Sequence, residues 1–182
     1  MDIDKKTGLI TQAEFIASPN HDDRPPDTVI DLLVVHNISL PPGQFGGPYI
    51  TQLFCNKLNP DEHSYFKEIA HLRVSAHFLI RRDGHLIQFV ATTKRAWHAG
   101  VSEFCGREKC NDFSIGIEME GSDDQAFEEA QYHTLARLVR LLKSAYPAIK
   151  TDNIAGHSDI APGRKTDPGP YFDWKRFKSD MA

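Results

Sequence analysis

The stretch Val29-Ile30-Asp31-Leu32-Leu33-Val34-Val35-His36 decides the fold class. It is almost continuously apolar and rich in β-branched residues, with Asp31 as its one charge, and this pattern predicts a buried β-strand. His36 stands at the C-terminal end of that strand, where the following loop is a common place for functional side chains. A buried strand that ends in a histidine is therefore the starting point for both the fold and the site.

Further strands and a long helix are predicted around this stretch. Ala76 to Val90 reads as a β-hairpin, because Asp83-Gly84 between two apolar runs is the dipeptide that a type I′ turn prefers. Phe113 to Met119 alternates apolar with polar residues, which predicts a strand whose polar face meets solvent or a cleft. Between Ser122, the start of an apparent capping box, and Pro147, apolar residues recur at helical spacing.

The remaining segments complete the predicted architecture. Residues 1–28 hold several prolines and aspartates and are expected to form an N-terminal surface arm, followed by one domain over residues 29–182. Short helices are expected at 49–56 and after Asn59, and a last helix after Asp173, with loop between residues 154 and 171. Strands and helices thus alternate irregularly, which predicts an α/β (α+β) domain with a mixed central β-sheet and helices packed on it.

Composition excludes several classes of partner. The 182 residues carry a net charge of −4, so no nucleic-acid partner is expected. No window approaches the ~18 consecutive apolar residues of a membrane span, and the first twenty residues do not resemble a signal peptide. Three cysteines are too few for a disulfide framework, so we expect a cytoplasmic protein. Nothing in the sequence indicates a protein partner.

The histidines point to a metal site. A catalytic zinc ion takes three protein ligands and leaves a fourth position for water, and His36, His157 and Asp167 would supply such a set in a surface cleft. Glu118, on the polar face of its strand, would then deprotonate that water, although Glu120 shares the face and periodicity does not exclude it. The alternatives are an edge histidine satisfied by its neighbours, a solvated loop around His157, and an exposed strand carboxylate.

Other polar residues flank the hairpin. Cations and an aromatic side chain stand on both sides of it, at Arg73 and at Lys94-Arg95-Ala96-Trp97. For His77 and His98 a buried position behind the metal ligands is favoured over metal ligation. Cys105 and Cys110 do not have a usual metal-binding spacing.

The sequence resembles a known family, the N-acetylmuramoyl-L-alanine amidases of type 2, which are related to phage zinc amidases and peptidoglycan recognition proteins. The resemblance extends from about residue 32 to residue 174 and is closest to the subgroup that acts in cell-wall recycling. The motifs that carry it are Leu33–Gly43, Val74–His77, Ala96–Val101, Asn111–Glu118, and Gly156-His157 with Lys165–Pro170.

The resemblance implies a hydrolase that cleaves the amide between 1,6-anhydro-N-acetylmuramic acid and the L-alanine of its stem peptide. By motif position it implies zinc held by His36, His157 and Asp167. It also implies Glu118 and Lys165 as the catalytic pair, with Lys165 placed to stabilise the oxyanion. An aspartate as third ligand favours the recycling subgroup, since phage-type relatives often have cysteine there.

The resemblance further implies a small-molecule anhydromuropeptide substrate. Positions that look substrate-lining in the family are matched by Asn37, Arg73, His77 and Trp97, and Lys109 stands where an arginine is expected. Lysine lacks the bidentate fork of arginine, so a carboxylate contact there would be weaker. The competing functions are a non-catalytic module that binds muropeptides and an exported lytic amidase that acts on intact peptidoglycan.

Overall fold

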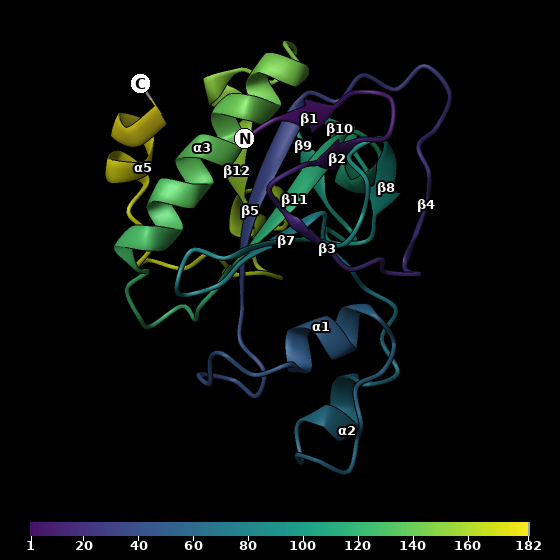
Figure 1. Cartoon of the computed structure of the whole chain (residues 1–182), viewed down its shortest axis with the longest axis vertical. Helices are drawn as coiled ribbons and strands as arrows, with labels where there is room; N and C mark the ends of the chain where they lie inside the picture. The colour runs from purple at the N-terminus through teal and green to yellow at the C-terminus, as the bar shows by residue number, and fades with distance from the viewer. Residues whose placement is uncertain (182) are drawn as a thin grey trace.

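A mixed six-stranded sheet is the largest sheet within residues 1–181, which are the residues that the computed structural model describes (Figure 1). Its strands, in spatial order, are β12 (Ile154–Gly156), β5 (Leu32–Ile38), β11 (Ser114–Glu120), β6 (Phe78–Ile80), β7 (Leu86–Gln88) and β3 (Glu14–Phe15). The first four strands run parallel to one another, β7 returns antiparallel to β6, and β3 runs parallel to β7. The predicted fold class is confirmed.

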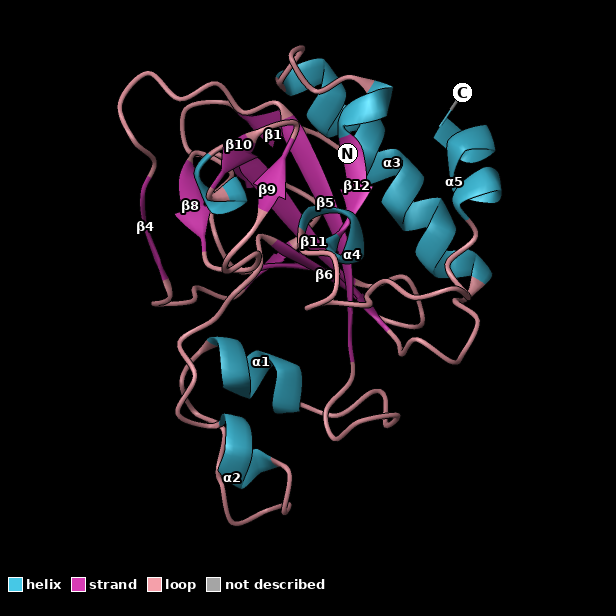
Figure 2. Ribbon diagram, turned by 180° about the vertical axis from the view of Figure 1, so that it is seen from behind, coloured by secondary structure: helices cyan, strands magenta, loops and turns pink. Residues whose placement is uncertain are grey.

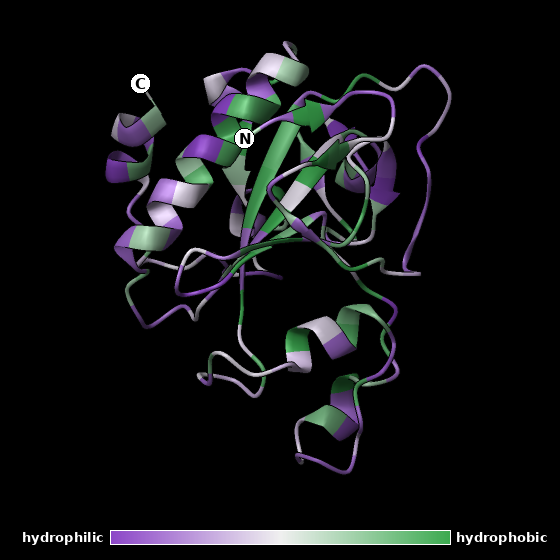
Figure 3. Ribbon diagram, in the orientation of Figure 1, coloured by the Kyte–Doolittle hydropathy of each residue, from purple (hydrophilic) through white to green (hydrophobic). Residues whose placement is uncertain are grey.

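Two helices cover one face of this sheet. In Figures 1 and 2, α3 (Glu129–Ala145) and α5 (Trp174–Met181) lie side by side against it. Because successive residues of a strand point to opposite faces, Leu33 and Val35 of β5 and the odd-numbered residues of β11 form the core with these helices. In Figure 3 the central strands are mostly apolar, whereas α3 alternates polar and apolar residues along its length.

A helical lobe, defined here as residues 41–75, lies at one end of the molecule. It contains α1 (Tyr49–Phe54) and α2 (Phe66–Ile69), which Figure 1 shows well away from α3 and α5. The lobe has its own apolar cluster, in which Phe54 and Phe66 are buried against residues of the hairpin. The lobe therefore forms a wall beside the ends of the strands.

The N-terminal segment 1–28 is attached along much of its length. It contains β1 (Ile3–Asp4), β2 (Leu9–Ile10), β3 and β4 (His21–Asp23). The strand β3 joins the central sheet beside β7, β4 pairs with β8 (Lys94–Ala96), and Asn20 is buried. The expected surface arm thus supplies an edge strand of the sheet.

The other short elements connect these layers. They are β9 (Glu103–Phe104), β10 (Arg107–Glu108), α4 (His157–Ile160) and the 3₁₀ turns at Cys110–Asp112 and Thr151–Asn153. Among residues 1–181, no helix combines the length and the apolar character that crossing a bilayer requires.

Several local predictions differ from the structure. The hairpin is present, but only Gly84 of its turn has positive φ, and Arg81 N–H bonds His85 O, so the connection is a type I turn with a bulge instead of type I′. The long helix begins after Glu128, whose side chain forms the capping box with Gln131. Asp173 does cap the last helix, accepting from Arg176 N–H.

Two further boundaries were wrong. Residues 154–171 are not loop throughout, because β12 extends the sheet and α4 follows it. The helix expected after Asn59 begins only at Phe66, since Asn59 Oδ1 accepts from Asp61 N–H and closes a turn there.

Candidate metal centre

Parallel strand pairing brings His36 and His157 together. In the register of β5 and β11, His36 stands opposite Glu118, and Gly156 of β12 stands opposite Val35. The next residue after Gly156 is His157, so both histidines lie at the carboxyl edge of the sheet, where α/β proteins usually bind ligands.

Asp167 arrives from the loop after α4. Its carbonyl accepts a hydrogen bond of 2.9 Å from Ser158 N–H, which fixes the loop beside the histidine pair. One oxygen of Asp167 lies 3.1 Å from Nδ1 of His36 and 3.1 Å from Nδ1 of His157, and the two Nδ1 atoms are 2.9 Å apart. The three predicted ligands therefore converge on one point.

The donor set fits a cation at that point. Nε2 of His157 lies 3.0 Å from the carbonyl oxygen of Ala99, which can only accept, so His157 carries its proton on Nε2 and directs a lone pair from Nδ1. Burial lowers the pKa of His36 to about 4, so this ring is neutral at pH 7. Burial opposes ionisation of Asp167, but contacts with His157 and His36 outweigh it and hold its pKa below the usual range. Converging lone pairs and a carboxylate repel one another without a positive charge between them.

Glu118 is a buried carboxylate with a free oxygen. It is 8% exposed, and its Oε2 has no hydrogen-bond partner among the described residues. Burial, and next the negative charge of Asp167, raise its pKa well above the ordinary value, while Lys165 acts in the opposite direction. A carboxylate in this state is suited to exchange a proton in the cleft.

Glu120, on the same face of β11, is fully engaged. Its Oε1 accepts from Gly46 N–H at 2.7 Å and from Nη1 of Arg81 at 3.0 Å, and its Oε2 accepts from Arg82 N–H at 3.1 Å. Glu120 therefore anchors the loop before α1 to the hairpin. Sequence alternation left the choice between the two carboxylates open, and the structure separates them by their partners.

The candidate metal centre opens into a cavity of about 360 Å³. Glu118 and Lys165 line it together with the three converging residues, and so do Asn37, Trp97 and His98. The other wall is apolar and was missed by the sequence analysis, because no local pattern shows that its residues pack together. That wall comprises Ile38, Leu40, Pro42, Leu53, Phe54, Tyr65, Ile69, Leu72 and Val74, most of them from the helical lobe.

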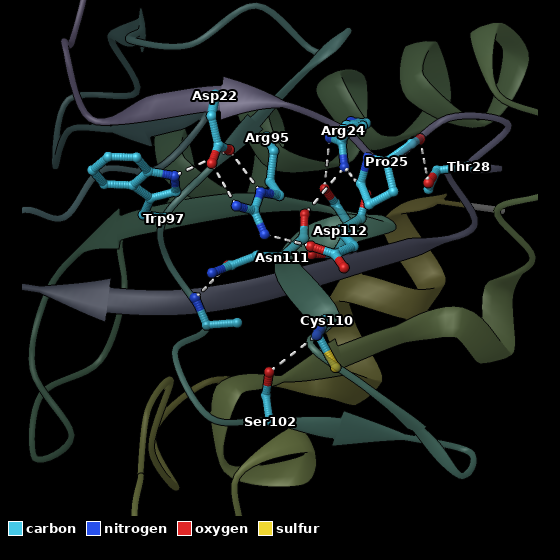
Figure 4. A network of polar contacts seen from close by, with 12 residues as sticks. Asp22, Arg24, Pro25, Thr28, Arg95, Trp97, Ser102, Cys110, Asn111 and Asp112 are labelled. Carbon is cyan, nitrogen blue, oxygen red and sulfur yellow. Dashed lines mark hydrogen bonds and ion pairs between the residues drawn. The ribbon is translucent and has the colours of Figure 1, made fainter.

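Asn37 and Trp97 are held in place by other side chains. Asn37 Nδ2 donates to Asp123 Oδ1 at 2.7 Å and to the carbonyl of Pro168 at 3.0 Å. Figure 4 shows the indole N–H of Trp97 directed at Asp22 of β4, at 3.2 Å. The N-terminal segment thus fixes one aromatic side chain of the cavity.

The other predicted substrate residues lie elsewhere. His77 is 0% exposed, its Nδ1 accepts from Gly116 N–H, and it is not among the described residues that line the cavity. Arg73 is exposed and is not among the described residues that line the cavity, although Leu72 and Val74 beside it are. Lys109 is exposed and borders a separate hollow together with Arg164.

Comparison with known proteins identifies the family. The profile of the family described as N-acetylmuramoyl-L-alanine amidase matches residues 25–170. The chain belongs to this amidase family. It is 60% identical over 171 residues to the 1,6-anhydro-N-acetylmuramyl-L-alanine amidase AmpD of Escherichia coli K12, covering 94% of this chain and 93% of that one.

Solved structures agree with this assignment. A crystal structure of a selenomethionine AmpD derivative superimposes with a TM-score of 0.96 at 56% identity, covering 100% of both chains. The amidase AmiD of Escherichia coli, in complex with the substrate anhydro-N-acetylmuramic acid-L-Ala-D-gamma-Glu-L-Lys, gives a TM-score of 0.62 at 28% identity over 86% of this chain and 60% of that one. The resemblance inferred from the motifs is confirmed.

Proposed function

We propose that the chain is a zinc-dependent amidase that hydrolyses the bond between 1,6-anhydro-N-acetylmuramic acid and the L-alanine of the stem peptide, in cytoplasmic recycling of cell-wall muropeptides. The observation that carries the proposal is the convergence of His36, His157 and Asp167 beside the buried, unpartnered carboxylate oxygen of Glu118. The high identity to AmpD supports the substrate.

The donor set supports zinc as the metal. Two imidazole nitrogens and one carboxylate oxygen are a usual catalytic zinc set, and a thiolate-rich set would indicate a structural site. Zinc held by His36, His157 and Asp167 would supply Lewis-acid activation of the substrate carbonyl and of the attacking water.

Glu118 would act as the proton carrier of the reaction. Its raised pKa and its place on the cavity wall suit it to take a proton from the attacking water and deliver it to the leaving nitrogen of L-alanine. Because its Oε2 is free of other bonds, no competing contact must break first.

Lys165 would stabilise the negative charge that develops on the carbonyl oxygen. It lines the same cavity, two residues before Asp167. The attraction between its ammonium group and the carbonyl oxygen grows as negative charge develops on that oxygen. We assign substrate binding to Asn37 and Trp97 in the cavity and to the exposed cations Arg73 and Lys109 beyond it.

The apolar wall matches the chemistry of the substrate. In a 1,6-anhydro sugar an ether bridge replaces two hydroxyl groups and closes a compact bicyclic ring, which suits residues such as Leu53, Phe54 and Tyr65.

The test is hydrolysis of a purified anhydromuropeptide, with metal content measured by mass spectrometry on the same sample. We expect one zinc per chain and release of free stem peptide, with loss of release when zinc is removed by a chelator. Binding without hydrolysis would favour a muropeptide-binding module. Faster release from intact peptidoglycan than from the anhydromuropeptide would favour a lytic amidase.

A further inference from the structure

We propose that two adjacent residues, His98 and Ala99, orient both histidine ligands of the metal centre, one through its ring and the other through its carbonyl group. The proposal rests on the proposed function, because it takes His36 and His157 as the ligands. His98 and Ala99 act as positioning residues, since each contacts a ligand at the ring nitrogen that faces away from the metal.

The Ala99 carbonyl fixes His157. It accepts from Nε2 of His157 at 3.0 Å and also from Nη2 of Arg164 at 2.7 Å. Arg164 also donates to the carbonyl of Val101, so its guanidinium group fixes the loop that follows His98. The His157 ring is thereby held in the tautomer that directs Nδ1 inward.

His98 performs the same task for His36 with a side chain. Its Nδ1 lies 2.9 Å from Nε2 of His36, and its own Nε2 lies 3.1 Å from Oγ of Ser114. A ligand that directs its Nδ1 lone pair at a metal carries its proton on Nε2, so His36 donates to His98 and His98 donates to Ser114. The three side chains form a hydrogen-bond chain with a single direction.

The backbone of His98 and Ala99 is itself held by hydrogen bonds. Oδ1 of Asn111 accepts from the N–H of His98 at 3.1 Å and from the N–H of Ala99 at 2.8 Å. Figure 4 shows Asn111 beside the Asp22, Arg95 and Asp112 network, which holds this region against β4. One amide side chain therefore sets the position of both groups that contact the ligands.

A glycine makes room for the His98 ring. A Cβ atom added at Gly116 would lie 2.6 Å from Nδ1 of His98, and the three atoms nearest to it all belong to that ring. Gly116 has no positive φ, so its backbone does not require glycine. The close approach of the His98 ring explains a glycine in the middle of a buried strand.

The test measures zinc affinity by chelator competition. His98→Leu removes the acceptor for His36 and should weaken zinc binding by about 10- to 100-fold, the usual effect of losing such a contact. In His98→Asn, Oδ1 can occupy the place of Nδ1, so zinc affinity should stay within about fivefold of wild type. The melting temperature of each metal-free protein shows whether the variant is folded. Wild-type affinity in His98→Leu would overturn the proposal.

Gly116→Ala provides an independent variant if His98→Leu does not fold. It should weaken zinc binding as His98→Leu does, but it should add little in a His98→Ala background, because the clashing ring is gone. Equal losses in both backgrounds would overturn the role of the ring.

The tautomers give a spectroscopic readout. In nitrogen-15 spectra of the zinc-loaded protein, His98 should carry its proton on Nε2, and a proton on Nδ1 would contradict the stated direction. A wild-type protein with no zinc affinity would defeat the proposed function. If wild type binds zinc and His98→Leu binds it equally tightly, only the positioning role of His98 would be contradicted.

Discussion

The two faces of the central sheet are both buried but differ in chemistry. The face under α3 carries Ile115, Ile117 and Met119, whereas the opposite face of the same strand carries Ser114, Gly116, Glu118 and Glu120. Burial of the first set is favourable on its own, because apolar area leaves water. Burial of the second set is costly unless each polar group has a partner.

The comparison teaches where stability and function separate. Substitutions under α3 should change the free energy of unfolding and leave zinc bound. Substitutions on the opposite face should change zinc binding or turnover, except where a polar group such as Glu120 has only structural partners. The following predictions test that division, from the largest expected effect to the smallest.

Loss of one metal ligand should abolish the activity. His36→Ala, His157→Ala and Asp167→Ala each leave two protein ligands, which hold a catalytic zinc ion poorly. We expect loss of tightly bound zinc by mass spectrometry and loss of nearly all hydrolysis. Stoichiometric zinc in all three variants would place the metal centre elsewhere.

Loss of a catalytic group should spare the metal. Glu118→Gln and Lys165→Ala should keep zinc while kcat falls by about 10²- to 10⁴-fold, with KM changing less, because both groups act on the transition state.

The matched control for Glu118 is Glu120→Gln. It leaves Arg81 with a weakened partner and should destabilise the protein by about 3 kcal/mol in urea unfolding, with nearly normal kcat in the folded fraction. If Glu118→Gln has a normal kcat and Glu120→Gln is inactive, the roles of the two carboxylates are reversed.

A substitution under α3 should act on stability alone. Leu138 is 0% exposed in the core, so Leu138→Ala should lower the free energy of unfolding by about 2–5 kcal/mol. Zinc affinity and kcat of the folded protein should match wild type. A clear loss of zinc affinity in this variant would show that the two faces are coupled.

Arg73→Ala should weaken substrate binding without touching the metal. If its guanidinium holds a stem-peptide carboxylate, KM should rise about tenfold, from roughly 1.5 kcal/mol for a charge-assisted hydrogen bond. Lys109→Arg should bind equally well or more tightly, because it restores a planar fork.

Substrate chemistry supplies the control for Arg73. A substrate whose peptide carboxylate is converted to an amide should lose more affinity for wild type than for Arg73→Ala. Equal losses in both proteins would assign Arg73 to structure.

Acid should destabilise the metal-free protein through its buried histidines. Burial, followed by the charge of Arg24, lowers the pKa of His77 to about 3, whereas an unfolded histidine titrates near 6.5. The unfolded state therefore binds more protons, and stability falls as pH drops from about 6.5 towards 3, by at most roughly 1.4 kcal/mol per pH unit for this group. Urea unfolding at several pH values should show a smaller slope for His77→Asn than for wild type.

The sequence predicted the elements that carry a strong local pattern. The apolar run of β5, the hairpin of β6 and β7 and the alternation of β11 each follow from side-chain spacing alone. The strand β12 was missed because it has three residues between Lys150 and the glycine- and proline-rich loop, and only its pairing with β5 makes it a strand. The start of α3 was misplaced because Ser122 bonds Asp124 instead of capping a helix.

The candidate site was predictable in its polar part only. A histidine after a buried strand and a second histidine ten residues before an aspartate indicated metal ligands, and the motifs distinguished Glu118 from Glu120. The apolar wall depends on how residues 41–75 pack against the strand ends, which no local pattern specifies. The sequence favoured a buried position for His77, but its partner, the backbone N–H of Gly116 39 residues away, follows from no local pattern.

The order in which the ligands occur along the chain has a consequence for biosynthesis. His36 is made first, and β12, His157 and Asp167 follow more than a hundred residues later, where β12 pairs with β5. The ribosome must therefore pass Asp167 before the three predicted ligands can converge. A chain that stops before that residue lacks one of them and should bind a metal ion poorly.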